Sequence, residues 1–266
     1  MTIGLKNSVG LLLASWSPLV YAAEEAHAGG GGGVAETINF YHMALHSLHL
    51  DPMWEPTLGA LACLVLLVLL GLSFRKSVLR DIDDVVPSGR FSLRFVFEEI
   101  LEFVVGLAKD NTGAKYRNYL PFLAALFLYI LVCNLSGLIP GFPPPTETMD
   151  NNVAIGLTVF LVYNVAGLKE HGAGYIKHFL GPVAFIAPLF FCIELVSHFS
   201  RPLSLGLRLA GNIYGDHTLL GVFTSISYLV FPAFLLFFGL LVAVVQSFVF
   251  TLLSGIYISM AISHDH

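Results

Sequence analysis

The chain has 266 residues, of which 56% are hydrophobic and only 12% are charged. A water-soluble domain is about a quarter charged, because its surface needs that much polar cover, so this composition excludes a water-facing shell and indicates a chain surrounded by lipid. The net charge of −5 is spread without a basic block, which argues against a nucleic-acid partner. Cys63, Cys133 and Cys192 all lie in apolar runs, so we predict buried thiols and no metal site.

Residues 1–33 are typical of a processed leader followed by a spacer. Lys6 precedes an apolar stretch over 9–20, residues 20–22 resemble a signal-peptidase site, and a glycine run ends at Gly33. We predict that the leader is cleaved and that the mature amino end lies outside the cell. An uncleaved first anchor is the alternative.

The next segment, 34–56, is predicted to be external and interfacial. His42, His46 and His49 are spaced by four and three, which places three imidazoles on one helical face. Two interpretations stay open: an interfacial helix with incidental histidines, or a weak metal patch. No glutamate follows His42, which excludes the HExxH zinc-protease motif.

Three uncharged runs, 57–74, 119–139 and 151–168, are long enough to cross a bilayer with modest help from their flanks. The charged segment between the first two contains a mixed apolar and acidic stretch. We predict that residues 91–109 form a helix lying in the membrane interface.

The positions of the lysines and arginines predict how the chain is oriented in the membrane. Eight of thirteen lie between Arg75 and Arg117, Lys169 and Lys177 lie in the next connection, and the connection 140–150 has none. Positive charge favours the cytoplasmic side, so 140–150 is predicted to be outside. This agrees with an external amino end, and we place the carboxyl end in the cytoplasm.

The carboxy-terminal third is too long for one upright span. From Thr218 to Ser263 no residue is Asp, Glu, Lys or Arg. As a single helix, this stretch would be about 69 Å long against a hydrocarbon core of about 30 Å. A turn near Pro232 therefore predicts a tilted hairpin of two helices, 182–224 and 231–262, each about 45–65 Å long. The predicted fold class is all-α: a polytopic membrane protein with about five to six membrane helices, including the interfacial helix and this hairpin.

The first hairpin helix carries unusual charges. Glu194, Arg201 and Arg208 are spaced by seven, which places them on one face, although we expect Pro202 to bend the helix locally and blur that alignment. An arginine near the bilayer centre costs about 2.5–3.5 kcal/mol, so it persists where it meets a partner charge, a cavity or a pathway. For Arg201, a structural pair with Glu194 and a role in a pathway stay open. For Arg208, the pathway is favoured over snorkelling to the interface.

These residues carry a family resemblance. The run from Glu194 to Asn212, ELVSHFSRPLSLGLRLAGN, closely resembles the signature of subunit a of F-type ATP synthases. The stretch beginning at Gln246 is similar to that family's final helix, and CNLSGLIP, ending at Pro140, resembles its third-helix exit. The similarity covers roughly 50–263.

The resemblance implies a function and partners. The family passes protons, or sometimes sodium ions, between two aqueous half-channels and a rotating ring of c subunits. The implied partners are the c-ring, the subunit b peripheral stalk and the rest of the F1Fo complex, in a bacterial inner membrane. Residues 57–266 would form the ion-channel domain, with 182–262 as its functional hairpin. No GxxxxGK[ST] motif is present, so the chain is predicted to be non-catalytic, without a cofactor.

The resemblance also implies roles for single residues. Arg208 would face the ring carboxylate and block proton leak, and His217 occupies the family's relay position. Asp216 stands where the bacterial pattern often has glycine, and Gly239 where many members have histidine. This departure leaves open which of Asp216 and His217 relays protons.

Further polar residues complete the predicted path. They are Asn212, Gln246 and Glu194 as ion-translocation residues, with Arg201 and Ser204 in support. Ser204 is open to either channel lining or helix packing.

Two other functions compete with this one. A secondary transporter would show matching halves, but the charges cluster in one third only. An intramembrane metalloprotease would need a ligand set, but His198 and His217 lie nineteen apart without the customary glutamate. Co-purification with a c-ring and a peripheral stalk would separate subunit a from both.

Overall fold

We describe the chain from a computed structural model. The described residues are 40–47, 51, 54–80, 93–139, 141–172, 187–226 and 230–263. The predicted leader, 1–33, lies outside these ranges, and so do the side chains of His42, His46 and His49. The described part is built of helices and contains no strand, which confirms the all-α fold class.

Three helices stand where the membrane spans were predicted. Helix α4 covers Glu55–Arg80, α6 covers Tyr116–Ser136 and α7 covers Met149–His171. Each contains an apolar stretch long enough to cross a bilayer, and Phe234–Ile262 of α10 is a fourth such stretch. A turn ends α6 three residues before the predicted end at 139.

Helix α5 covers Leu93–Thr112 and matches the helix predicted over 91–109. Its buried residues Val104 and Ala108 are four apart and so share one face, where α5 packs against α6 and α10. Phe95 and Val96 remain exposed near its start. One apolar face therefore packs on the protein, while other apolar side chains remain available to lipid.

The predicted hairpin is present as two long helices. Helix α9 covers the 40 residues Ala187–Ile226, and α10 covers the 33 residues Val230–Ile262. At 1.5 Å per residue they are about 60 Å and 50 Å long, within the predicted range. Both exceed the hydrocarbon thickness of a bilayer.

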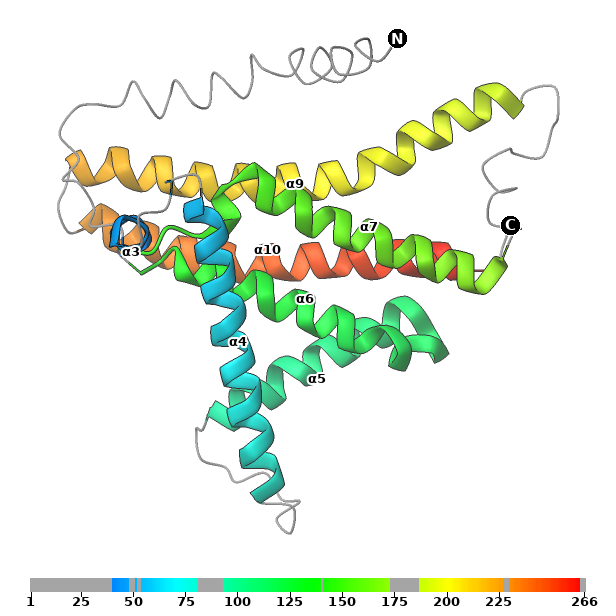
Figure 1. Cartoon of the computed structure of the whole chain (residues 1–266), viewed down its shortest axis with the longest axis horizontal. Coiled ribbons are helices and arrows are strands. Elements are labelled where there is room, and N and C mark those ends of the chain that lie inside the picture. The colour runs from blue at the N-terminus through cyan, green and yellow to red at the C-terminus, as the bar shows by residue number, and fades with distance from the viewer. Residues whose placement is uncertain are drawn as a thin grey trace. The chain divides into compact units, whose positions relative to one another are not determined.

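Helices α9 and α10 lie side by side (Figure 1). Helix α7 packs against both, α6 packs against α10, and α5 packs against α6 and α10. Helix α4 packs mainly on α6 and runs steeply across the direction of α9 and α10 (Figure 1). If α4 stands upright in a bilayer, the hairpin is strongly tilted, as its length requires.

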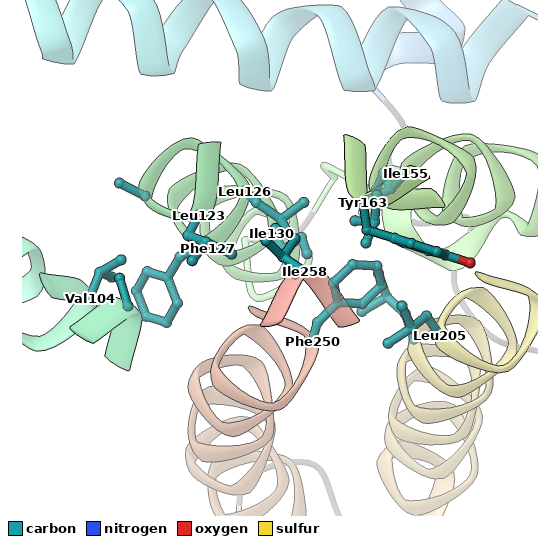
Figure 2. Packing of buried hydrophobic residues seen from close by; sticks show 14 of the residues in the cluster. Val104, Leu123, Leu126, Phe127, Ile130, Ile155, Tyr163, Leu205, Phe250 and Ile258 are labelled. Atoms are coloured by element: carbon teal, nitrogen blue, oxygen red, sulfur yellow. The ribbon is translucent and has the colours of Figure 1, made fainter. Parts of the chain in front are cut away.

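The core lies where α6, α7, α9 and α10 meet (Figure 2). Ile130, Tyr163, Leu205, Phe250 and Ile258 come from these four helices, and each is at most 2% exposed. Large apolar side chains also cover the outer faces of α4, α9 and α10. Such extensive apolar exposure is expected of a surface that faces lipid or other subunits.

Helices α7 and α9 approach each other closely at two glycines. A Cβ atom on Gly156 would lie 2.6 Å from the carbonyl oxygen of Pro202, and one on Gly206 would lie 3.2 Å from that of Asn152. Small residues permit such packing, on which membrane helices depend because lipid supplies no hydrophobic force between them. Pro202 and Gly206 are one turn apart, so one face of α9 is held against α7 just before Arg208.

A buried polar network joins α6, α7 and α10 beside the loop predicted to be external. The Asn134 amide donates to the Ala243 carbonyl (3.4 Å), and the Thr146 hydroxyl donates to the Asn134 side-chain oxygen (2.8 Å). The Asn152 amide donates to the Thr146 carbonyl (2.6 Å). These bonds hold the three helices together at this end while satisfying polar groups that lipid cannot.

Helix α3, Phe40–Ser47, forms inside the segment predicted to be external. The Phe40 backbone N–H donates to the Gly141 carbonyl (3.0 Å), and the Phe40 ring stacks on that of Phe142 with 5.0 Å between centroids. Gly141 has φ +90°, a conformation that favours glycine. The two segments predicted to be external therefore lie on the same side of the fold.

The cysteine prediction was correct for two residues. Cys63 and Cys133 are buried, as expected for thiols in apolar runs, whereas Cys192 is exposed on α9. An apolar run in a membrane protein contains lipid-facing positions as well as core positions, so the run alone does not determine which way a side chain points.

Replacing Gly156 by alanine should destabilise the fold. The new methyl group would meet the Pro202 carbonyl, and overpacking of this kind costs about 1–3 kcal/mol. The matched control is Gly71→Ala on α4, where nothing lies within 4 Å and alanine favours the helix. Thermal unfolding of the purified protein in detergent would measure both. Equal melting temperatures for the two variants would contradict the close α7–α9 contact.

Candidate functional site

Arg208 lies on α9 with an exposed side chain. Within the described part of the chain, no carboxylate lies within 4 Å of its guanidinium, unlike Arg201 and Lys115, which have acidic partners. A guanidinium stays protonated at any physiological pH. The site therefore contains a permanent positive charge that these residues do not neutralise.

The surroundings of Arg201 agree with a structural pair with Glu194, one of the two interpretations that the sequence left open. Its guanidinium lies 3.9 Å from a Glu194 carboxylate oxygen and 5.6 Å from the centroid of the Tyr257 ring. The pair is partly open, since the Glu194 side chain is 38% exposed. Arg201 thus has an anion and an aromatic face beside it, while the Glu194 carboxylate remains accessible.

Helices α9 and α10 are joined by an amide pair one turn beyond Arg208. The Asn212 amide donates to the Gln246 side-chain oxygen at 2.7 Å. Gln246 is only 4% exposed, and its own amide nitrogen has no partner in the described part of the chain. A buried donor without a partner is costly, so this nitrogen marks a polar group that the described residues leave unsatisfied.

An open groove of about 380 Å³ runs between α9 and α10 beside this amide pair. Its polar lining comes from Asn212, Asp216 and Gln246, and Gly211 and Gly215 leave room on the α9 side. Apolar residues of α10 form the opposite wall; they are Phe238, Leu241, Val242 and Val245. A groove with acid and amide groups on one wall is suited to hold water.

The remaining predicted residues are placed as follows. Asp216 lines the groove and is half-buried. His217 follows it on α9, so the two side chains leave the helix about 100° apart; the His217 side chain lies outside the described residues. Ser204 is exposed on α9, and Gly239 lies on α10 against Leu138.

A second polar cluster joins α7 to α9 and was not predicted. His198 is buried on α9, and its ring Nε2 lies 2.9 Å from the Asn164 side-chain oxygen. The adjacent Tyr163 hydroxyl donates to the His198 carbonyl at 3.3 Å. The signal in the sequence was the polar pair Tyr163-Asn164 inside an apolar run, which predicts a buried contact but does not identify the partner.

The polar groups of α9 lie on both sides of Arg208 along the helix. Glu194 precedes it by 14 residues, about 21 Å, and Asp216 follows it by eight, about 12 Å. On an uninterrupted helix, the charged Arg208 therefore stands between two separate acidic regions.

Comparison with known proteins identifies the family. The family described as ATP synthase A chain matches residues 58–259. The chain is 48% identical over 198 residues to ATP synthase subunit a of Bdellovibrio bacteriovorus, covering 74% of this chain and 86% of that protein. It is 40% identical to ATP synthase subunit a 1 of Syntrophotalea carbinolica over 88% of this chain and 93% of that protein. It is 39% identical to ATP synthase subunit a of Geobacter sp. strain M21 over 86% of this chain and 97% of that protein.

The Asn212–Gln246 bond should appear as coupling between two mutations. We expect the summed losses of unfolding free energy in Asn212→Ala and Gln246→Ala to exceed the loss in the double variant by about 0.6 kcal/mol, the average for hydrogen bonds between membrane helices. Unfolding of the purified protein in detergent measures this, with Ser204→Ala as an exposed control on the same helix. Strictly additive costs would show that the amides do not interact.

Proposed function

The chain belongs to the ATP synthase A chain family, and we propose that it conducts protons through the membrane sector of an F-type ATP synthase. Two aqueous half-channels meet a rotating ring of c subunits at Arg208. The observation that carries this proposal is the exposed guanidinium of Arg208, which no carboxylate of the described residues neutralises. It lies between Glu194 on one side and the Asp216 groove on the other.

Arg208 acts as an electrostatic gate. Its charge attracts the carboxylate of each passing c subunit and lowers the pKa of that carboxyl group, so the ring releases its proton there. The same charge repels a cation that would move directly between the half-channels. One charge crossing 100 mV carries about 2.3 kcal/mol, which a direct leak would waste as heat.

The outer half-channel is the groove between α9 and α10. Asp216 and its neighbour His217 exchange protons with water, and Asn212 and Gln246 hold water or the ring carboxylate close to Arg208. A histidine with a pKa near 6.5 suits a relay at neutral pH. The inner half-channel opens at Glu194, whose exposed carboxylate is the acid on that side of α9.

The membrane orientation follows from charge. The lysine-rich and arginine-rich connections lie in the cytoplasm, so α9 begins at the cytoplasmic side and the Asp216 groove opens to the periplasm. The membrane is the bacterial inner membrane, and the related proteins come from bacteria. The partners are the c-ring and the subunit b stalk, and the ATP chemistry belongs to other subunits. The carried ion is the proton; sodium would require a binding site on the ring.

Replacing Arg208 by alanine should abolish ATP-driven proton pumping while the complex still assembles. Without the positive charge, protons cross between the half-channels and the ring carboxylate is no longer held ionised. Fluorescence quenching of a pH-sensitive dye in inverted membrane vesicles measures pumping. The control is Arg117→Ala, which removes an exposed arginine far along the chain from α9. Coupled pumping retained in Arg208→Ala would refute the gate.

Replacing His217 by alanine should change how pumping depends on pH. An imidazole relay works only while it can both gain and lose a proton, so its loss should change the pH dependence of pumping. Asp216→Asn is the matched variant on the neighbouring groove residue. An unchanged pH profile in His217→Ala, with a reduced rate in Asp216→Asn, would assign the relay to Asp216.

A further inference from the structure

Pro202 leaves a gap in the hydrogen bonding of α9. Proline has no backbone N–H, so the carbonyl of His198, four residues earlier, loses its usual helical donor. The Tyr163 hydroxyl of α7 donates to this carbonyl at 3.3 Å, and it also lies 3.5 Å from both ring nitrogens of His198. Figure 2 shows the Tyr163 ring extending from α7 toward α9 with its hydroxyl at the far end. Tyrosine therefore supplies from outside the donor that proline removes from within.

The side chain of the same histidine is held by the next residue of α7. The Asn164 amide nitrogen donates to the Phe160 carbonyl at 2.7 Å, which fixes the orientation of the amide group. The Asn164 side-chain oxygen then faces Nε2 of His198 at 2.9 Å. Because an amide oxygen can only accept, the proton of the His198 ring lies on Nε2. Adjacent residues of α7 thus bind both the main chain and the ring of His198.

These contacts lie close to the packing point of the two helices. The carbonyl of Pro202 itself rests against Gly156, where a Cβ atom would lie only 2.6 Å away. Arg208 follows Pro202 by six residues, about 9 Å along the helix. A change of 10° in the bend at Pro202 would therefore move Arg208 by about 1.5 Å. A displacement of this size matters for a charge that must meet a passing carboxylate.

We propose that Tyr163 and Asn164 are positioning residues for Arg208. The Tyr163 hydroxyl replaces the donor that Pro202 lacks, and together with the Asn164–His198 bond it sets the bend of α9. This inference rests on the proposed role of Arg208 as the gate.

The test is a double-mutant cycle of Tyr163→Phe and Pro202→Ala in the assembled complex, with the initial rate of ATP-driven pumping as the readout. Phenylalanine keeps the packing of the ring and removes only the hydroxyl. We expect Tyr163→Phe to lower the rate about threefold or more, because a displaced Arg208 meets the passing carboxylate less well. Alanine at 202 restores a backbone donor to the His198 carbonyl, so Tyr163→Phe should cause no further loss in that background. The same fold-loss in both backgrounds, or none in either, would overturn the proposal.

Two further variants distinguish a failure of the proposed function from a failure of the positioning role alone. Tyr257→Phe removes the hydroxyl of a neighbouring tyrosine, whose ring centroid lies 6.1 Å from that of Tyr163. It should change the pumping rate by the same factor with proline and with alanine at position 202. Arg208→Ala is measured in the same vesicles. If Arg208→Ala pumps normally, the proposed function fails; if it stops pumping and the cycle is additive, only the positioning role fails.

A spectroscopic measurement covers the case in which Pro202→Ala does not assemble. Carbonyl-¹³C histidine with ¹⁵N phenylalanine selects the two His-Phe bonds of the chain, at His178 and His198. In solid-state NMR spectra, Tyr163→Phe should move the His198 carbonyl signal toward the position of a carbonyl without a hydrogen bond. The His178 signal should stay in place. An unmoved His198 signal would overturn the proposal.

Discussion

Arg208 carries a permanent charge on a helix whose neighbouring side chains are mostly apolar. Near the centre of a bilayer such a charge costs about 2.5–3.5 kcal/mol, and the described part of the chain provides no carboxylate to offset it. Arg201, one heptad earlier, has both Glu194 and the Tyr257 ring beside it. The contrast between two arginines on one helix is explained if Arg208 faces water and an acid that belongs to another chain.

The rest of the fold keeps that charge in place without competing for it. Hydroxyl groups buried on α10 are satisfied within their own helix: Ser247, Thr251 and Ser254 each donate to a carbonyl four residues earlier at 2.8 Å. Gln246 differs, because its oxygen accepts from α9 and its buried nitrogen has no partner among the described residues. The Gln246 amide is thus a buried polar group of α10 that bonds across to α9, one turn beyond Arg208.

Much of this architecture could be predicted from local sequence. The charge-free runs predicted α4, α6 and α7 because a bilayer requires about 20 apolar residues, and chain length alone required a turn between α9 and α10. The spacing of seven predicted that Glu194 and Arg201 share a face. In the structure, a guanidinium nitrogen of Arg201 lies 3.9 Å from a carboxylate oxygen of Glu194. These are properties of one helix at a time.

Contacts between helices could not be predicted in the same way. The Asn164–His198 and Asn212–Gln246 pairs each join residues 34 apart, and each depends on how far one helix slides along another. Between α7 and α9 the register is constrained by the close approach at Gly156, which the sequence records only as one glycine among 25. Apolar runs likewise do not distinguish a lipid-facing side chain from a core side chain, which is why the exposure of Cys192 was missed.

The most direct test is a high-resolution map of the assembled complex that resolves the side chain at position 208. The guanidinium should point at the carboxylate of the nearest ring subunit, with water densities reaching that point from the Asp216 groove on one side and from Glu194 on the other. A guanidinium pointing into lipid, or bound to a fixed carboxylate of a stationary subunit, would contradict the account.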